Sequence, residues 1–179
     1  MTTKKIIRNA FVGMAGILSF SSCSTIPKGV NAVSSFEIEK YMGKWYEIAR
    51  MDFRFERNLN NTTAEYSIKK NGTIQVDNRG YNYLTKEWKQ AIGKAKFAGD
   101  PDIAMLKVSF FGPFYSGYNV IALDSEYTYA LICGKNLRYL WILSRRTILP
   151  EDIKMKYLKI AQKAGYDTSS LVWVEHNQE

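Results

Sequence analysis

The chain has 179 residues, with 25 basic and 17 acidic side chains and a net charge of +8 at pH 7. This length suits one domain with a substantial core, and the charge favours anionic ligands or surfaces without requiring a nucleic acid. Only two cysteines and one histidine are present, which excludes a disulfide-rich scaffold, a histidine-based metal centre and a histidine-based catalytic triad. We therefore expect no metal and no other cofactor.

The first 22 residues are typical of a secretory signal, with three basic residues at the start and an apolar stretch over residues 10–20 that is too short to span a membrane stably. Cys23 ends this leader and resembles the lipidated cysteine of bacterial lipoproteins, although Phe20 stands where that motif usually has leucine. The resemblance implies that Cys23 carries a lipid anchor; the alternative is an ordinary signal peptide with an incidental cysteine. Removing residues 1–22 takes away three basic residues and no acidic one, which lowers the net charge from +8 to +5.

Residues 23–34 predict an anchor and a short tether, because small residues dominate and no hydrophobic period is present. The folded domain is then expected over residues 35–179, beginning with one helical turn at residues 36–42. Gly43-Lys44-Trp45 follows this turn and opens the first strand pattern.

Eight strand patterns follow one another at close spacing along the chain. Asn71-Gly72 predicts a two-residue hairpin turn between the second and the third. Gly93 predicts a bulge or bend inside the fourth. The expected strands are residues 45–51, 62–68, 73–78, 88–97, 105–110, 118–123, 127–133 and 139–144.

The hydrophobic period then changes to that of a helix. Pro150 and two acidic residues suit a first helical turn, an apolar stripe runs from Ile153 to Ala164, and Gly165 is a natural stop. A ninth short strand is expected at residues 171–174. The sequence therefore predicts an all-β fold: an eight-stranded antiparallel up-and-down β-barrel with one C-terminal α-helix packed outside. Such a barrel has room for one small ligand.

Successive connections of an up-and-down barrel alternate between its two ends, and one set of connections here is longer (residues 52–61, 79–87, 111–117 and 134–138). We expect this set to form the open mouth, because loops on a rigid scaffold usually carry binding. Aromatic and basic residues gather in it and fit a ligand with an apolar tail and an anionic head. Any one of them can be an ordinary loop residue, but their concentration at one end favours function. The candidate ligand-binding residues of mouth and cavity are Phe53, Phe55, Arg57, Tyr81, Phe111, Phe114, Tyr115 and Tyr118.

The other end is expected to be closed. Trp45 begins the first strand and Arg145 follows the eighth, and these strands are neighbours in a closed barrel, so a cation–π contact between the two residues is expected. With Gly43, they form a structural signature and not a ligand site. Glu47 should face outwards or pair with a base, and His176 should lie in a frayed tail.

Several segments resemble the lipocalin family. Residues 43–50 resemble its first-strand signature, and Arg145 resembles the arginine that packs on the signature tryptophan. Residues 55–57, 107–115 and 118–124 look like the bacterial outer-membrane lipoprotein subgroup, which is related to apolipoprotein D. The resemblance covers roughly residues 33–175.

What the resemblance implies is a membrane-anchored carrier of fatty acids or lysophospholipids in the bacterial envelope. Ser24 after the cysteine resembles the sorting signal for the outer membrane, with the domain facing the periplasm. Surface exposure and pairing as a homodimer are left open. The alternative is a lipocalin-fold enzyme that uses Asp or Glu on a small hydrophobic substrate. A nucleic-acid-binding barrel ranks below both, because exported proteins seldom meet such partners, and we expect neither an enzyme nor a nucleic-acid partner.

Overall fold

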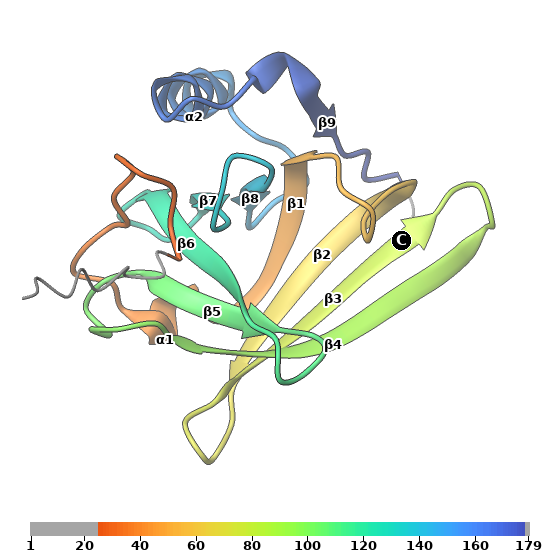
Figure 1. Ribbon diagram of the computed structural model, residues 1–179. Helices are drawn as coiled ribbons and strands as arrows, with labels where there is room; N and C mark the ends of the chain where they lie inside the picture. Colours follow the sequence, from red (N-terminus) through yellow and green to blue (C-terminus); the bar gives the residue numbers. More distant parts are fainter. Residues whose placement is uncertain (1–24, 178–179) are drawn as a thin grey trace, which may run out of the picture.

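The computed structural model describes residues 25–177, so the expected signal peptide and Cys23 lie outside the described residues. Eight antiparallel strands follow one another around a barrel, and pairing of β1 with β2 closes it. This confirms the expected fold (Figure 1). The strands are β1 (Gly43–Met51), β2 (Leu59–Ile68), β3 (Ile74–Asn82), β4 (Glu87–Phe97), β5 (Met105–Ser109), β6 (Ser116–Leu123), β7 (Tyr129–Cys133), β8 (Leu140–Ser144) and β9 (Leu171–Trp173).

The two α-helices of the described residues are α1 (Ile38–Tyr41) and α2 (Glu151–Lys163), and a short 3-10 helix, η1 (Thr168–Ser170), precedes β9. In the part of the chain that the structure describes, no helix is long and apolar enough to cross a membrane. α2 begins after Pro150 with two acidic residues in its first turn, and the positive φ of Gly165 follows its end. It lies outside the barrel (Figure 1), where Tyr157 donates a hydrogen bond of 2.8 Å to the carbonyl oxygen of Tyr129.

The core has two layers. One fills the closed end and the inner wall of the barrel, from Phe36 and Trp45 to Leu143. The other lies between the outer wall and α2 and includes Cys133. Burial raises the pKa of the Cys133 thiol to about 12, which suits an inert core residue.

Two glycines act differently from the expectation. Gly72 has a φ of 76° and closes a three-residue loop between Lys69 and Thr73, so the hairpin forms without the expected two-residue turn. Gly93 pairs with Val76 with no register shift, so the expected bulge is wrong for the β3–β4 pair. A side chain at Gly93 would meet the ring of Phe110 at 2.8 Å, and the glycine permits this close approach.

Residues 25–34 pack along the barrel, although they were expected to be a tether. The amide of Val33 donates to the carbonyl oxygen of Val120 at 2.9 Å, and its carbonyl accepts from the amide of Ala104 at 2.9 Å. Asn119 donates to the carbonyl oxygen of Thr25 at 2.8 Å. The segment runs beside β5 and β6 (Figure 1), so the described chain is held to the wall from Thr25 onwards.

The C-terminal residues are also held, which corrects the expectation of a frayed tail. One ring nitrogen of His176 lies 2.8 Å from the carbonyl oxygen of Glu47, and its ring meets that of Tyr46 edge-on at 5.4 Å. The amide of Asn61 donates to the carbonyl oxygen of Glu175 at 2.8 Å. β9 pairs with the end of β1, and the residues after β9 cover the adjoining part of β1 and the start of β2.

Candidate ligand-binding cavity

A cavity of about 610 Å³ lies inside the barrel. Small and aliphatic side chains such as Ala64, Val76, Ala95 and Leu106 line its wall. A volume of this size and a mostly apolar lining are typical of sites that enclose a small hydrophobic ligand.

Exposed phenylalanines stand at the mouth of the cavity. Phe55, Phe111 and Phe114 line it and are 71, 69 and 79 % exposed. Phe55 and Phe111 come from different connections, and their ring centroids lie 6.2 Å apart. Exposed aromatic side chains at a cavity entrance are unusual unless something apolar covers them. They can bury the part of a ligand that emerges from the barrel.

Six of the eight candidate ligand-binding residues line the cavity: Phe53, Phe55, Phe111, Phe114, Tyr115 and Tyr118. Arg57 and Tyr81 do not line the cavity. Arg57 is exposed and pairs with Asp52 at 3.2 Å. Tyr81 meets the ring of Trp88 edge-on at 5.5 Å, because the two residues are cross-strand partners on β3 and β4.

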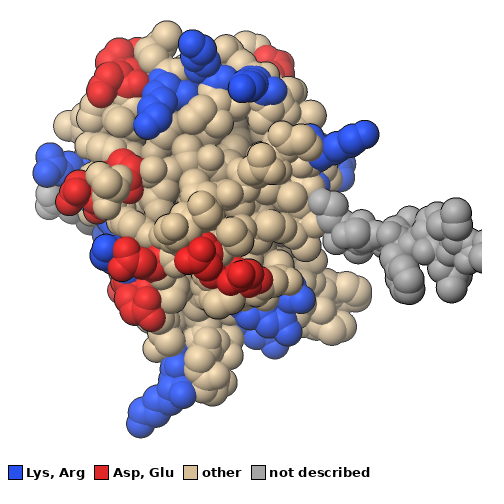
Figure 2. Space-filling model, turned by 90° about the vertical axis from the view of Figure 1, so that its left-hand side faces the viewer, with Lys and Arg blue, Asp and Glu red and all other residues tan. Residues whose placement is uncertain are grey.

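Basic side chains that line the cavity are Arg79, Lys89 and Lys135. Lys135 lies in the β7–β8 connection, while Arg79 and Lys89 come from the β3–β4 hairpin. On the side of the molecule where α1 lies, Figure 2 shows Asp and Glu side chains interspersed with Lys and Arg side chains. These three basic side chains favour anionic groups at the mouth, although Arg79 also pairs with Asp77 at 3.5 Å.

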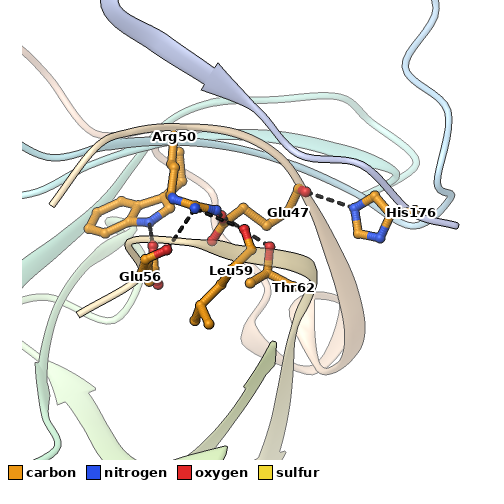
Figure 3. Close-up of polar contacts among 7 residues, drawn as sticks. Glu47, Arg50, Glu56, Leu59, Thr62 and His176 are labelled. Atoms are coloured by element: carbon orange, nitrogen blue, oxygen red, sulfur yellow. Dashed lines mark hydrogen bonds and ion pairs between the residues drawn. The ribbon is translucent and has the colours of Figure 1, made fainter. Parts of the chain in front are cut away.

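A buried polar cluster interrupts the apolar wall (Figure 3). Glu47 pairs with Arg50 at 2.7 Å and accepts a hydrogen bond of 3.2 Å from the hydroxyl of Thr62. Arg50 also donates to the carbonyl oxygens of Glu56 and Leu59, at 2.7 and 3.0 Å. Arg50 therefore ties β1 to the first mouth loop (residues 52–58). Pairing with a base is one of the two environments expected for Glu47, and it is confirmed.

Glu56 adds a second carboxyl group to this cluster. It accepts a hydrogen bond of 3.0 Å from the indole of Trp141 on β8. Burial and the charge of Glu47 hold the pKa of Glu56 well above its usual value. Burial also raises the pKa of Glu47, although Arg50 opposes this effect. Arg50 pairs with the carboxyl group of Glu47 alone, so the cluster is neutral when Glu56 keeps its proton.

Three tyrosines form the floor of the cavity (Tyr41, Tyr66 and Tyr118). The hydroxyl of Tyr118 lies 2.6 Å from that of Tyr41 and 2.8 Å from that of Tyr66. Burial raises the pKa of all three phenols, so they remain protonated at neutral pH. Of the three, only Tyr118 was predicted from the sequence to bind a ligand. Tyr41 lies outside the predicted strands, and the sequence around Tyr66 is that of an ordinary core position.

Below this floor, the guanidinium of Arg145 lies 3.9 Å from the ring centroid of Trp45, as the topology predicted. Its nitrogens donate to the carbonyl oxygens of five residues: Lys40, Tyr41, Met42, Lys44 and Tyr127. Gly43 has a φ of 89°, and a side chain there would reach Arg145 at 3.4 Å. Trp45 is completely buried and does not line the cavity, so this contact closes the barrel.

Within residues 25–177, no three His, Cys, Asp or Glu side chains are grouped so that they could hold a metal ion. The described polar groups of the cavity are carboxyl groups, phenols, cations, and the hydroxyl and amide side chains of Thr62, Thr63, Asn78, Gln90 and Ser116.

Comparison with known proteins identifies one family model and several relatives. The model of the lipocalin-like domain matches residues 36–176. The outer membrane lipoprotein Blc of Escherichia coli K12 is 51 % identical over 154 residues, which cover 86 % of this chain and 87 % of that protein. The protein of the same name from Vibrio cholerae is 44 % identical over 94 % of this chain and 99 % of its own. Apolipoprotein D of Rattus norvegicus is 35 % identical over 70 % of this chain and 68 % of its own.

Among solved structures, insecticyanin of the tobacco hornworm Manduca sexta has the same fold, with a TM-score of 0.69. The alignment covers 87 % of this chain and 88 % of insecticyanin, at 20 % sequence identity.

Proposed function

Because the chain belongs to the lipocalin family, it is a carrier of hydrophobic ligands, and we propose that it stores or transports fatty acids or lysophospholipids in the bacterial cell envelope. The observation that carries this proposal is the apolar cavity of about 610 Å³ under a mouth of exposed phenylalanines. An acyl chain buried there gains about 25 cal/mol for each Å² of apolar surface removed from water.

The charges at the mouth support an anionic head group. Arg79, Lys89 and Lys135 line the cavity at its open end, where a carboxylate or phosphate could pair with them while remaining partly hydrated. Glu47 and Glu56 also line the cavity, and an ionised carboxyl group there disfavours a second anion beside it. A single-tailed amphiphile with its head at the mouth suits this distribution.

We further propose that Cys23 carries a lipid that holds the protein on the outer membrane, with the domain facing the periplasm. The names of the relatives from Escherichia coli and Vibrio cholerae, which are called outer membrane lipoproteins, support this location. Residues 1–22 are then the cleaved signal. Pairing as a homodimer stays an expectation.

The test is to purify residues 24–179, extract bound lipids and identify them by mass spectrometry. Titration with a fluorescent fatty acid and a fluorescent lysophospholipid gives the affinity, which we expect in the micromolar range. Val108→Trp, which fills part of the cavity wall, should weaken binding while the circular dichroism spectrum stays that of a folded barrel. If the wild-type protein binds no hydrophobic ligand near micromolar concentration, the carrier proposal fails.

A further inference from the structure

The three floor tyrosines come from separate parts of the chain and meet at their hydroxyl groups. Tyr41 belongs to α1, Tyr66 to β2 and Tyr118 to β6. Tyr41 and Tyr66 are only 2 and 7 % exposed, and all three line the cavity. The fold thus brings a polar group to the one end of the cavity that is closed to solvent.

The hydrogens of this group can be counted. Each phenol has one hydrogen to donate, and the three oxygens make two contacts with one another. Within the part of the chain that the structure describes, these hydroxyls have no other hydrogen-bond partner, so two contacts use two of the three hydrogens. Whichever way the bonds run, one phenolic hydrogen remains for something inside the cavity. A buried donor without an acceptor is costly.

The surroundings favour an electron-rich oxygen at this position. Arg145 lies behind Tyr41 and donates only to carbonyl oxygens, so no carboxylate in the described chain neutralises its charge. The acidic pair of Glu47 and Glu56 is bound to Arg50 and Trp141 on the wall. The phenols of the floor are thus the hydrogen-bond donors that an oxygen at this end of the cavity would meet.

We propose that Tyr41, Tyr66 and Tyr118 form a polar subsite that donates a hydrogen bond to an acceptor oxygen on the buried end of the ligand. This rests on the proposed carrier function and adds a chemical class to it: an amphiphile with a carboxyl, keto or hydroxyl oxygen that reaches the floor. The oxygen has two sources. It belongs to the carboxyl group of a fatty acid inserted head first, or to an oxygenated acyl chain whose head stays at the mouth.

The informative variant replaces all three tyrosines by phenylalanine. Tyr118→Phe alone would leave two phenols without a partner, whereas the triple variant Tyr41→Phe/Tyr66→Phe/Tyr118→Phe removes every hydroxyl and keeps the shape of the floor. Replacing all partners of a buried hydrogen bond by apolar groups of the same shape is close to neutral for stability. The matched control is Tyr157→Phe, which removes a buried phenol between α2 and the outer wall.

Two probes separate the sources of the oxygen. Stearate and 12-hydroxystearate are titrated in competition with a fluorescent fatty acid. Stearate labelled with ¹³C at its carboxyl carbon is observed by NMR with a water-soluble paramagnetic agent, which broadens the signal of an exposed carboxyl group and leaves a buried one sharp. Thermal unfolding of each variant shows that the barrel is intact.

We expect the affinity of the triple variant for the probe whose oxygen reaches the floor to fall about tenfold, because one hydrogen bond is lost. Tyr157→Phe should bind both probes as the wild type does. A shielded carboxyl signal supports head-first insertion, and a preference for 12-hydroxystearate that the triple variant lacks supports an oxygenated chain. The inference is overturned if the triple variant binds both probes with wild-type affinity. A wild-type protein that binds neither these nor any other lipid would instead overturn the carrier proposal.

Discussion

Glu47 and Arg50 form an ion pair inside the barrel wall, 2.7 Å apart and almost completely buried. Such a pair adds little net stability compared with apolar residues, but breaking it strands a charge in the interior. Arg50 also donates hydrogen bonds to two backbone carbonyl oxygens, one in the first mouth loop and one at the start of β2. Its loss therefore removes more contacts than the ion pair alone.

Arg50→Met should therefore lower the free energy of unfolding by about 3–5 kcal/mol. It leaves Glu47 and Glu56 without their cation and the loop carbonyls without their donor. Urea denaturation measures the change. Arg57→Met is the matched control, since Arg57 forms an exposed pair with Asp52 and its loss should cost less than about 1 kcal/mol. Equal losses for the two variants would contradict a structural role of the buried cluster.

Glu56 should make the stability of the protein fall as the pH rises. Its pKa is higher in the folded state than the usual 4.5, so the folded protein holds this proton more tightly than the unfolded chain does. The stabilisation is complete below pH 4.5 and is lost as the pH rises through the folded pKa. Glu47 contributes with the same sign.

Glu56→Gln cannot ionise, so its free energy of unfolding should fall less than that of the wild type between pH 5 and pH 9. Urea midpoints at several pH values give the two slopes. The exposed Glu151, which pairs with Lys154 on α2, provides the control variant Glu151→Gln. Parallel curves for Glu56→Gln and the wild type would show that the carboxyl group is already ionised at pH 5.

Arg145→Ala should affect stability more than ligand affinity. The variant loses hydrogen bonds to several carbonyl oxygens and the contact with Trp45, for a destabilisation of about 2–4 kcal/mol. Affinity for a fluorescent fatty acid should change less than about twofold, because Arg145 does not line the cavity. Arg146→Ala, at the exposed neighbouring position, is the control. A large loss of affinity with unchanged stability would place Arg145 in the ligand site.

Phe111→Ser should weaken binding without lowering stability, because the side chain is exposed in the free protein and would be covered only by a ligand. Part of a buried phenylalanine is worth about 1 kcal/mol, or roughly fivefold in the dissociation constant. Fluorescence titration measures this. Ile148→Ser removes another exposed apolar side chain, one that does not line the cavity, and should leave affinity unchanged. Indistinguishable affinities would remove Phe111 from the candidate site.

Cys23→Ala should release the protein from the membrane or stop its processing, since the proposed lipid has no other attachment. Fractionation and the mass of the mature protein report both outcomes. Cys133→Ala is the control, because that thiol is buried within the folded domain. Normal processing and unchanged membrane fractionation of Cys23→Ala would disprove the anchor.

The barrel could be predicted from the sequence because its strands alternate and its connections are short. The ends of β2 and β3 could not. Residues 79–82 look like a loop because polar residues and Gly80 break the apolar alternation, and only their pairing with β2 and β4 reveals them as strand.

The cavity was predicted as an apolar container, and its polar groups were mostly missed. The approach of Glu56 to Trp141 joins residues 85 positions apart, and no local pattern reports such a contact. Residues 25–34 look like a tether in the sequence because their contacts are backbone hydrogen bonds to Ala104 and to Val120 on β6 and scattered apolar side chains, and such contacts leave no hydrophobic period.

Arg145 joins the segment around α1 to the end of β8 and to Tyr127 through bonds that need no covalent chemistry. In many small exported domains a disulfide has this role. The described fold contains no disulfide that a reductant could cleave. Its single thiol, Cys133, is buried and protonated and is therefore a poor target for oxidants. The contacts that close the barrel therefore do not depend on the redox state of the surroundings.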